Sequence, residues 1–175
     1  YENWWMREAL VNGWDMNHSP LMFFPDGFDL TLQPRRYMSF PIWLVLYEIF
    51  GEPTAYNLTI LIEVWVKAYA MYLFLMVMVK HRGGAWIGGA LFAFTARGLS
   101  LALQQPDTGA TEFIPIFMLA FVSLRHRLKS DEPLSTRTWL LWVLAIVLAY
   151  SGNVYQNLKI GVFAALVGGV FIAWM

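Results

Sequence analysis

Cysteine is absent from the chain. Its absence excludes disulfide bonds, thiolate metal sites and cysteine nucleophiles. Charge is also scarce, because only 14% of the residues are charged, against about a quarter in a typical soluble domain. Positive and negative residues balance to a net charge of zero, so no electrostatic attraction to nucleic acid is expected. These absences exclude an ordinary soluble domain and a nucleic-acid-binding protein.

Apolar residues make up most of the chain, at 58%, and the mean hydropathy is +0.50. Runs of about 18 or more apolar residues are typical of membrane helices, and the chain contains several. We interpret the chain as an internal segment of a longer polytopic protein whose last span is truncated. The sequence therefore predicts an all-α, polytopic transmembrane helix bundle. About five spans are expected, at residues 54–79, 84–104, 109–124, 138–151 and 158–175.

The first part of the chain is predicted to be a long loop on one face of the membrane. Residues 3–14 place polar side chains on one helical face and apolar ones on the other, and their tryptophans suit the headgroup region. Residues 15–36 contain proline and glycine turn signals. The apolar run at 37–50 is short for a span, which favours an interfacial or re-entrant helix. We therefore expect two domains, an outer loop at 1–53 and a transmembrane bundle at 54–175.

Lysines and arginines indicate how the chain is oriented. The turns at 80–84 and 125–137 hold six of the twelve Lys and Arg residues, whereas those at 104–112 and 151–157 hold none. Short cytoplasmic loops are enriched in these cations. The two basic turns are therefore predicted to be cytoplasmic, which places residues 1–53 on the outer face of the membrane.

Carboxylates gather on the predicted outer face, where they could supply a general base or ligands for a metal ion. Loops that meet water are polar for that reason alone, so each acid also has a purely structural interpretation. The acids in question are Glu2, Glu8, Asp15, Asp26, Asp29, Glu48, Glu52, Asp107 and Glu112.

Three charged residues lie well inside predicted spans, away from their ends. Glu63 and Lys67 are four residues apart, in the order that favours a helical ion pair. Charges at membrane depth are costly, so these two either neutralise each other or serve a substrate or proton. Arg97 lies near the middle of the second predicted span. It could hold a lipid phosphate or pair with a neighbouring helix.

Few local motifs point to chemistry. Gly84 and Gly88 have the spacing of a helix-packing pair. The three histidines have no metal-ligand spacing, and the sequence has no zinc signature, nucleotide-binding loop or nucleophile elbow. No protein metal site is predicted. The polar cluster at 151–157, which includes Gln156, either contacts a substrate or caps a helix.

One pattern resembles a known family. The order WW…REALVNGWD…NHSPLMFFPDGFDL, followed by an apolar segment that ends in FGEPTAYNL, resembles the first outer loop of bacterial polytopic glycosyltransferases of the GT-C type. The later stretches GALFAFTARGLSLALQQ and EFIPIFMLAFVSLRHR are similar to the next helix pair of these proteins. The resemblance covers most of the chain and depends on aromatic, proline and glycine positions.

The resemblance implies transfer of a sugar from a polyprenyl-phosphate carrier to an acceptor at the outer, periplasmic face of the cell membrane. An acid shortly after the first transmembrane helix would act as general base or metal ligand, and a divalent metal ion is left open as a cofactor. A second acidic site would lie in the loop at 104–112, and cations would assist the phosphate leaving group. The predicted catalytic residues are Glu2, Asp15 and Asp107, and the predicted contacts to substrate or lipid phosphate are Arg97, Arg35, Arg36, Glu112 and Gln156.

Two other functions remain open. The chain could be a non-catalytic subunit of a larger membrane assembly, which fits the lack of a strong catalytic motif. It could also be a transporter, for which Glu63 and Lys67 are the only support, although the expected inverted repeat is not seen in the sequence. The expected partners are the lipid bilayer, a lipid-linked sugar and other membrane subunits.

Overall fold

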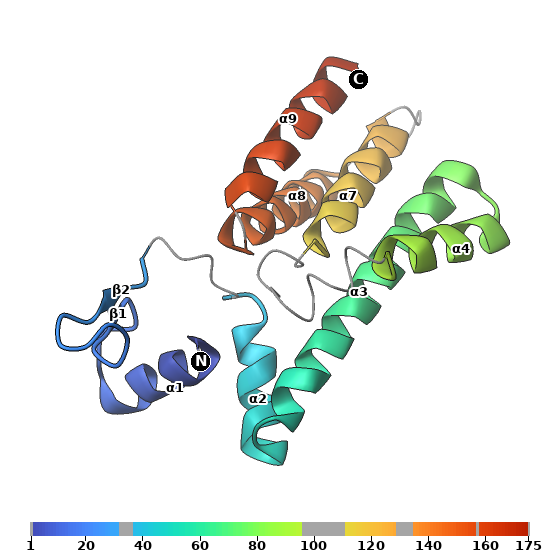
Figure 1. Ribbon diagram of the computed structural model, residues 1–175. Coiled ribbons are helices and arrows are strands. Elements are labelled where there is room, and N and C mark those ends of the chain that lie inside the picture. Colours follow the sequence, from blue (N-terminus) through green and yellow to red (C-terminus); the bar gives the residue numbers. More distant parts are fainter. Residues whose placement is uncertain (1, 32–36, 96–110, 129–134, 157, 175) are drawn as a thin grey trace. The chain divides into compact units, whose positions relative to one another are not determined.

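The computed structural model describes residues 2–31, 37–95, 111–128, 135–156 and 158–174 (Figure 1). Helix accounts for 76% of the structure, in seven helices among the described residues. The predicted all-α class is confirmed, with the addition of one very short pair of strands. The chain divides into two compact units, Tyr1–Thr59 and Ile60–Met175. The predicted division into an outer loop and a membrane bundle stays a prediction.

The first unit begins with helix α1 (Glu2–Asn12), which is followed by strands β1 (His18–Ser19) and β2 (Phe28–Asp29). The strands are antiparallel, and His18 lies opposite Asp29. The helix ends at Gly13, whose φ of +67° is the left-handed conformation that glycine adopts at helix C-termini. The predicted helix at 3–14 is thus confirmed, and the predicted loop after it contains the strand pair.

A small apolar core joins α1 to the loop that follows it. Trp5, Ala9 and Leu30 are buried there. The backbone N–H of Leu30 donates to the carbonyl of Asn17 at 2.7 Å, which holds the far end of the loop against its start. This core fixes the loop relative to the helix, and the candidate site depends on that arrangement.

Helix α2 (Phe40–Phe50) has 11 residues and is about 16 Å long at 1.5 Å per residue. That is about half of the roughly 30 Å hydrocarbon core of a bilayer, in agreement with the prediction of a short helix. It ends at Gly51, whose N–H donates to the carbonyl of Tyr47 at 2.8 Å. Trp43 is fully buried, and its indole N–H donates to Glu52 at 2.8 Å. The interfacial or re-entrant placement of α2 stays a prediction.

Helix α3 (Thr54–Val79) coincides with the first predicted span. Its 26 residues extend about 39 Å, more than the roughly 30 Å that a span requires. Among the helices that the structure describes, α3 is the one that is long and apolar enough to cross a membrane. The structure therefore contains one candidate membrane-spanning helix, and the multi-pass bundle stays a prediction.

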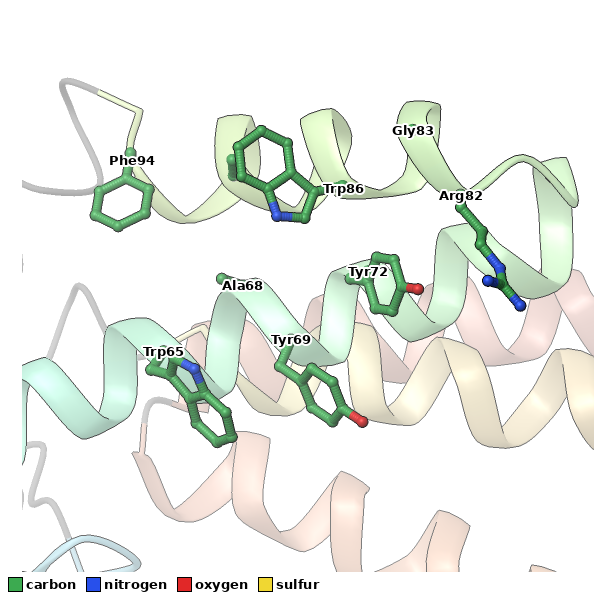
Figure 2. Close-up of a pocket in the computed structure, with 9 residues that line it drawn as sticks. Trp65, Ala68, Tyr69, Tyr72, Arg82, Gly83, Trp86 and Phe94 are labelled. Carbon is green, nitrogen blue, oxygen red and sulfur yellow. The ribbon is translucent and has the colours of Figure 1, made fainter.

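Helix α4 (Arg82–Ala93) packs against α3 and forms a helical hairpin with it (Figure 2). His81 caps the helix, because its Nδ1 accepts a hydrogen bond from the N–H of Gly84 at 3.0 Å. The closest approach is at Gly89, where an added Cβ would lie 2.7 Å from the carbonyl oxygen of Ala68. Small residues therefore permit this packing.

Helices α7 (Phe113–Leu128), α8 (Thr136–Gln156) and α9 (Leu158–Trp174) pack on one another (Figure 1). Their core is formed by side chains from all three helices: Phe117, Phe121, Ala149 and Ala164. Two glycines make room for it, since a Cβ at Gly152 would lie 2.6 Å from the ring of Phe113 and one at Gly168 would lie 3.1 Å from Phe117.

The predicted spans at 109–124, 138–151 and 158–175 thus correspond to helices, although α7 and α8 extend beyond the predicted ends. In α7 the last turn carries Arg125, His126 and Arg127. These residues are polar, but cations at a helix C-terminus interact favourably with the helix dipole. The second predicted span, at 84–104, is not one continuous helix, because α4 ends at Ala93 with Phe94 at its C-cap; residues 96–104 lie outside the described part of the chain.

Candidate functional site

A cavity of about 460 Å³ lies in the unit Tyr1–Thr59, between α1 and the loop that follows it. Its wall combines indole rings with two carboxylates and one imidazole. The lining residues are Trp4, Trp5, Glu8, Trp14, Asp15, His18, Pro20 and Leu21.

The aromatic wall is built by a helix and by the turn that ends it. Trp4 and Trp5 lie four and three residues before Glu8 on α1, so all three fall on one side of the helix. After Gly13 the chain folds back, and the N–H of Trp14 donates to the carbonyl of Ala9 at 2.8 Å. This places the ring of Trp14 on that of Trp5, with centroids 5.7 Å apart and planes inclined by 23°.

The two stacked indoles differ in their access to solvent. Trp5 is 2% exposed and its indole N–H is buried without an acceptor in the part of the chain that the structure describes. Trp14 is 54% exposed. The buried ring therefore supports the exposed one, and Trp14 presents an open aromatic face at the cavity.

The two carboxylates have different hydrogen-bond partners. Glu8 accepts from Nη1 of Arg7 at 2.9 Å through Oε1 and from the side-chain amide of Asn12 at 3.4 Å through Oε2. Asp15 is exposed and accepts from the backbone N–H of Asn17 at 2.8 Å through Oδ1. Both oxygens of Glu8 are thus engaged within the protein, whereas the bond to Asp15 orients its carboxylate through one oxygen.

Arg7 connects this region to α2. Its Nε donates to Glu48 at 2.8 Å, and its guanidinium lies over the ring of Tyr47, 5.0 Å from the centroid. The hydrogen bond that Arg7 donates to Glu48 is the largest of the influences that raise the pKa of Arg7 above its ordinary value. Arg7 therefore stays charged beside Glu8 and holds α1 against α2.

His18 lines the cavity and lies very close to the tip of the loop. Gly27 has a φ of +78°, and a Cβ there would lie 2.5 Å from Nε2 of His18. A side chain at this position would therefore displace the imidazole. The Pro25-Asp26-Gly27 turn thus shapes the cavity without contributing to its lining.

Of the predicted catalytic residues, Asp15 lines the cavity. Glu2 lies in the first turn of α1 and is half-buried, but it is not among the lining residues. Glu112, a predicted substrate contact, is only 4% exposed and immediately precedes α7 in the second unit. These two assignments stay predictions without a described cavity around them.

The remaining predicted site residues lie beyond the part of the chain that is described. Asp107, Arg97, Arg35 and Arg36 fall outside the described residues, and so does the side chain of Gln156, the last residue of α8. Their predicted roles are untested.

Sequence reasoning missed most of the cavity wall. The sequence predicts that the tryptophans of α1 meet lipid headgroups and that polar and apolar side chains lie on opposite helical faces, whereas Trp5 and Glu8 line the same cavity. A signal was present, because Trp4 and Glu8 have the i, i+4 spacing of one helical face. The approach of Trp14 depends on the turn at Gly13, which helical periodicity does not report.

Within the described ranges, no group of three or more His, Asp or Glu side chains is placed to hold a metal ion. The charged pair in the predicted span also has a defined environment: Lys67 is 4% exposed and Glu63 is half-buried. Whether they neutralise each other stays a prediction.

Comparison with known proteins finds no match to this chain among protein-family models, curated proteins or solved structures. The resemblance to GT-C glycosyltransferases therefore stays a prediction from the residues quoted above. The lining residues of the cavity are what bears on the function.

Proposed function

We propose that the chain is part of a GT-C-like membrane glycosyltransferase that moves a sugar from a polyprenyl-phosphate carrier to an acceptor on the outer face of the membrane. The cavity of the first unit would hold the sugar. The observation that carries the proposal is the combination of an open tryptophan face with an oriented carboxylate, Trp14 and Asp15, in one cavity.

Sugars fit such a wall for physical reasons. One face of a pyranose ring presents C–H groups, which pack on an aromatic ring, while its edge presents hydroxyls, which donate to carboxylates. Trp14 supplies the first kind of contact and Glu8 and Asp15 the second. The volume of about 460 Å³ falls within the range of about 300–1,000 Å³ for small-molecule sites.

Asp15 is the proposed general base. It would take the proton of the acceptor hydroxyl while that oxygen forms a bond to the anomeric carbon. The bond between the anomeric carbon and the phosphate oxygen breaks, and polyprenyl phosphate leaves with the electron pair. Glu8 is less suited to this step because Arg7 and Asn12 already engage its two oxygens. It would instead anchor the sugar.

The membrane setting of the proposal is supported by α3, which is long and apolar enough to span a bilayer, and by the concentration of cations at 80–84 and 125–137. The predicted roles of Arg97, Arg35 and Arg36 at the phosphate and of Glu2, Asp107, Glu112 and Gln156 at the substrate remain part of the same proposal.

The test compares two aspartates in the same loop. Asp15 and Asp29 each accept a hydrogen bond at 2.8 Å from the backbone N–H two residues later, and both are exposed. Only Asp15 lines the cavity. The Asp15→Asn and Asp29→Asn variants therefore each remove one exposed carboxylate charge from the loop, and they differ in access to the proposed substrate.

The full-length protein would be assayed with a panel of short-chain polyprenyl-phosphate sugars, and release of polyprenyl phosphate would be measured. Asp15→Asn is expected to lower the transfer rate about 100-fold or more, the usual contribution of a general base, while Asp29→Asn retains it. Equal rates in the two variants would disprove the role of Asp15. Sugar binding without transfer from any donor would favour a non-catalytic subunit.

A further inference from the structure

A second cavity, of about 570 Å³, lies between α3 and α4 (Figure 2). We call it the hairpin groove. Its walls are aromatic: Trp65, Tyr69 and Tyr72 come from α3, and Trp86 and Phe94 come from the α4 side. A single cation, Arg82, lines it at one end, and Figure 2 shows Phe94 and Trp65 at the other.

The aromatic side chains of the groove are unusually open. Trp65 and Trp86 are 65% and 69% exposed, and Phe94 is 61% exposed. Trp65 stacks on Tyr69 with centroids 5.4 Å apart and planes inclined by 4°. Their rings therefore form a continuous apolar strip along α3. Large apolar surfaces of this kind mark contact with lipid, a ligand or another protein.

The two helices of the groove approach each other closely at Gly89. At Gly89 an added Cβ would lie 2.7 Å from the carbonyl oxygen of Ala68 and 3.2 Å from the backbone N of Tyr72. The two helices are therefore in backbone contact at this point. Aromatic residues of both helices line the groove near this contact.

The positive charge at one end of the groove favours an anionic occupant. Arg82 is exposed, and Lys80 and His81 precede it in the turn. The sequence has no Asp or Glu between Glu63 and Asp107, so no nearby carboxylate in the hairpin sequence offsets these cations. The charged end of the groove is thus complementary to an anion, and the rest of it to an apolar chain.

Length points to the same occupant. Helix α4 has 12 residues and extends about 18 Å, close to half of the roughly 30 Å hydrocarbon core of a bilayer. A chain laid from Arg82 to Phe94 would therefore traverse about one leaflet. Anionic phospholipids combine a phosphate with acyl chains of this length, and basic pockets between membrane helices hold such headgroups.

We propose that the hairpin groove binds an anionic phospholipid, with the phosphate at Arg82 and one acyl chain along the aromatic strip. The lipid is distinct from the sugar carrier of the proposed function, because the Arg82 end of the hairpin belongs to the turn that the cation distribution assigns to the cytoplasmic side. Its role would be to hold α3 and α4 in the inner leaflet.

The experiment uses native mass spectrometry of the full-length protein in detergent with equal amounts of phosphatidylglycerol and phosphatidylcholine of identical acyl chains. About fivefold preferential retention of phosphatidylglycerol is expected, since one surface cation favours an anionic lipid by about that factor. The Arg82→Gln variant should lose the preference. The control Arg137→Gln removes an exposed cation from the start of α8 and should keep it.

A second variant tests the same site in case Arg82→Gln fails to fold. Gly83→Glu places a carboxylate in the groove beside Arg82, where Gly83 is exposed and an added Cβ would meet only the ring of His81 at 3.3 Å or more. It should also abolish the preference, while helicity measured by circular dichroism stays unchanged. Excess glycerol phosphate, which has no acyl chains, should not displace the lipid.

Three results would overturn the proposal. The first is an unchanged ratio of the two lipids in both Arg82→Gln and Gly83→Glu. The second is equal retention of the two lipids by the unaltered protein. The third is a lipid-independent dimer, or a protein helix cross-linked to Trp86, because the groove would then be covered by protein.

Discussion

At the residue scale, two glycines with similar backbone conformations have different surroundings. Gly13 and Gly27 have φ values of +67° and +78°, in the left-handed region that disfavours other residues. Nothing lies within 4 Å of a Cβ added at Gly13, whereas one added at Gly27 would meet His18 at 2.5 Å. The first glycine is therefore required by conformation alone, and the second also by space.

This difference predicts unequal effects of the same substitution. Gly13→Ala is expected to lower the free energy of unfolding by about 1 kcal/mol, the strain of a left-handed non-glycine residue. Gly27→Ala should lower it by about 2 kcal/mol, because its Cβ would also meet the ring of His18 and lie 3.2 Å from the backbone carbonyl oxygen of Ser19. Denaturant titration of the purified protein, followed by tryptophan fluorescence, measures both. Equal losses would contradict the close approach of Gly27 to His18.

Asp15 illustrates what could be predicted about the site residue by residue. The resemblance to GT-C glycosyltransferases predicts that Asp15 is catalytic, and in the structure Asp15 lines a cavity. The sequence does not predict Trp14 as a site residue, because its position depends on the chain reversal at Gly13 and on the hydrogen bond from its N–H to the carbonyl of Ala9. A residue type can suggest its chemistry, but its neighbours across a turn are decided by backbone geometry.

At the element scale, apolar run length predicted helices well and their ends less well. The run at 54–79 coincides with α3 because it is bounded by the turn residues Pro53 and Lys80 and contains no internal break. The C-terminal end of α7 differs from the predicted one because Arg125 and Arg127 are polar yet favourable in a last helical turn. Hydropathy reports burial, whereas helix ends also depend on the dipole and on caps.

The packing of α4 on α3 gives a prediction at the same scale. Gly89→Ala should separate the two helices, because its Cβ would meet the backbone carbonyl of Ala68, which cannot move without shifting α3. Thermal unfolding in detergent is expected to show a clear fall in Tm. The control is Gly169→Ala in α9, where nothing lies within 4 Å.

That control should be neutral or stabilising by up to about 1 kcal/mol, because alanine favours helix over glycine. If Gly89→Ala also proved neutral or stabilising, the backbone contact between α3 and α4 would be absent.

At the scale of the whole molecule, the distribution of cations predicts which segments share a side of the membrane. The chain has no cysteine, so single-cysteine variants of this segment carry no background label. Asp26→Cys lies in the predicted outer loop and Leu128→Cys at the end of α7, and both positions are exposed.

In intact cells a membrane-impermeant maleimide is expected to label the Asp26→Cys variant. The Leu128→Cys variant should react only after permeabilisation, since the positive-inside rule assigns its turn to the cytoplasm. Labelling is read by gel shift or mass spectrometry. Reaction of both variants from the same side would contradict the predicted topology.

The sequence by itself determined the helical class, the long apolar helix α3 and the uneven placement of cations. These follow from composition and from patterns local to one segment, which a chain carries without folding. The tertiary structure alone decided the two cavities. Stacking of Trp14 on Trp5 and backbone contact at Gly89 each bring together residues from different elements, and such proximity arises only when the elements pack and turns reverse the chain.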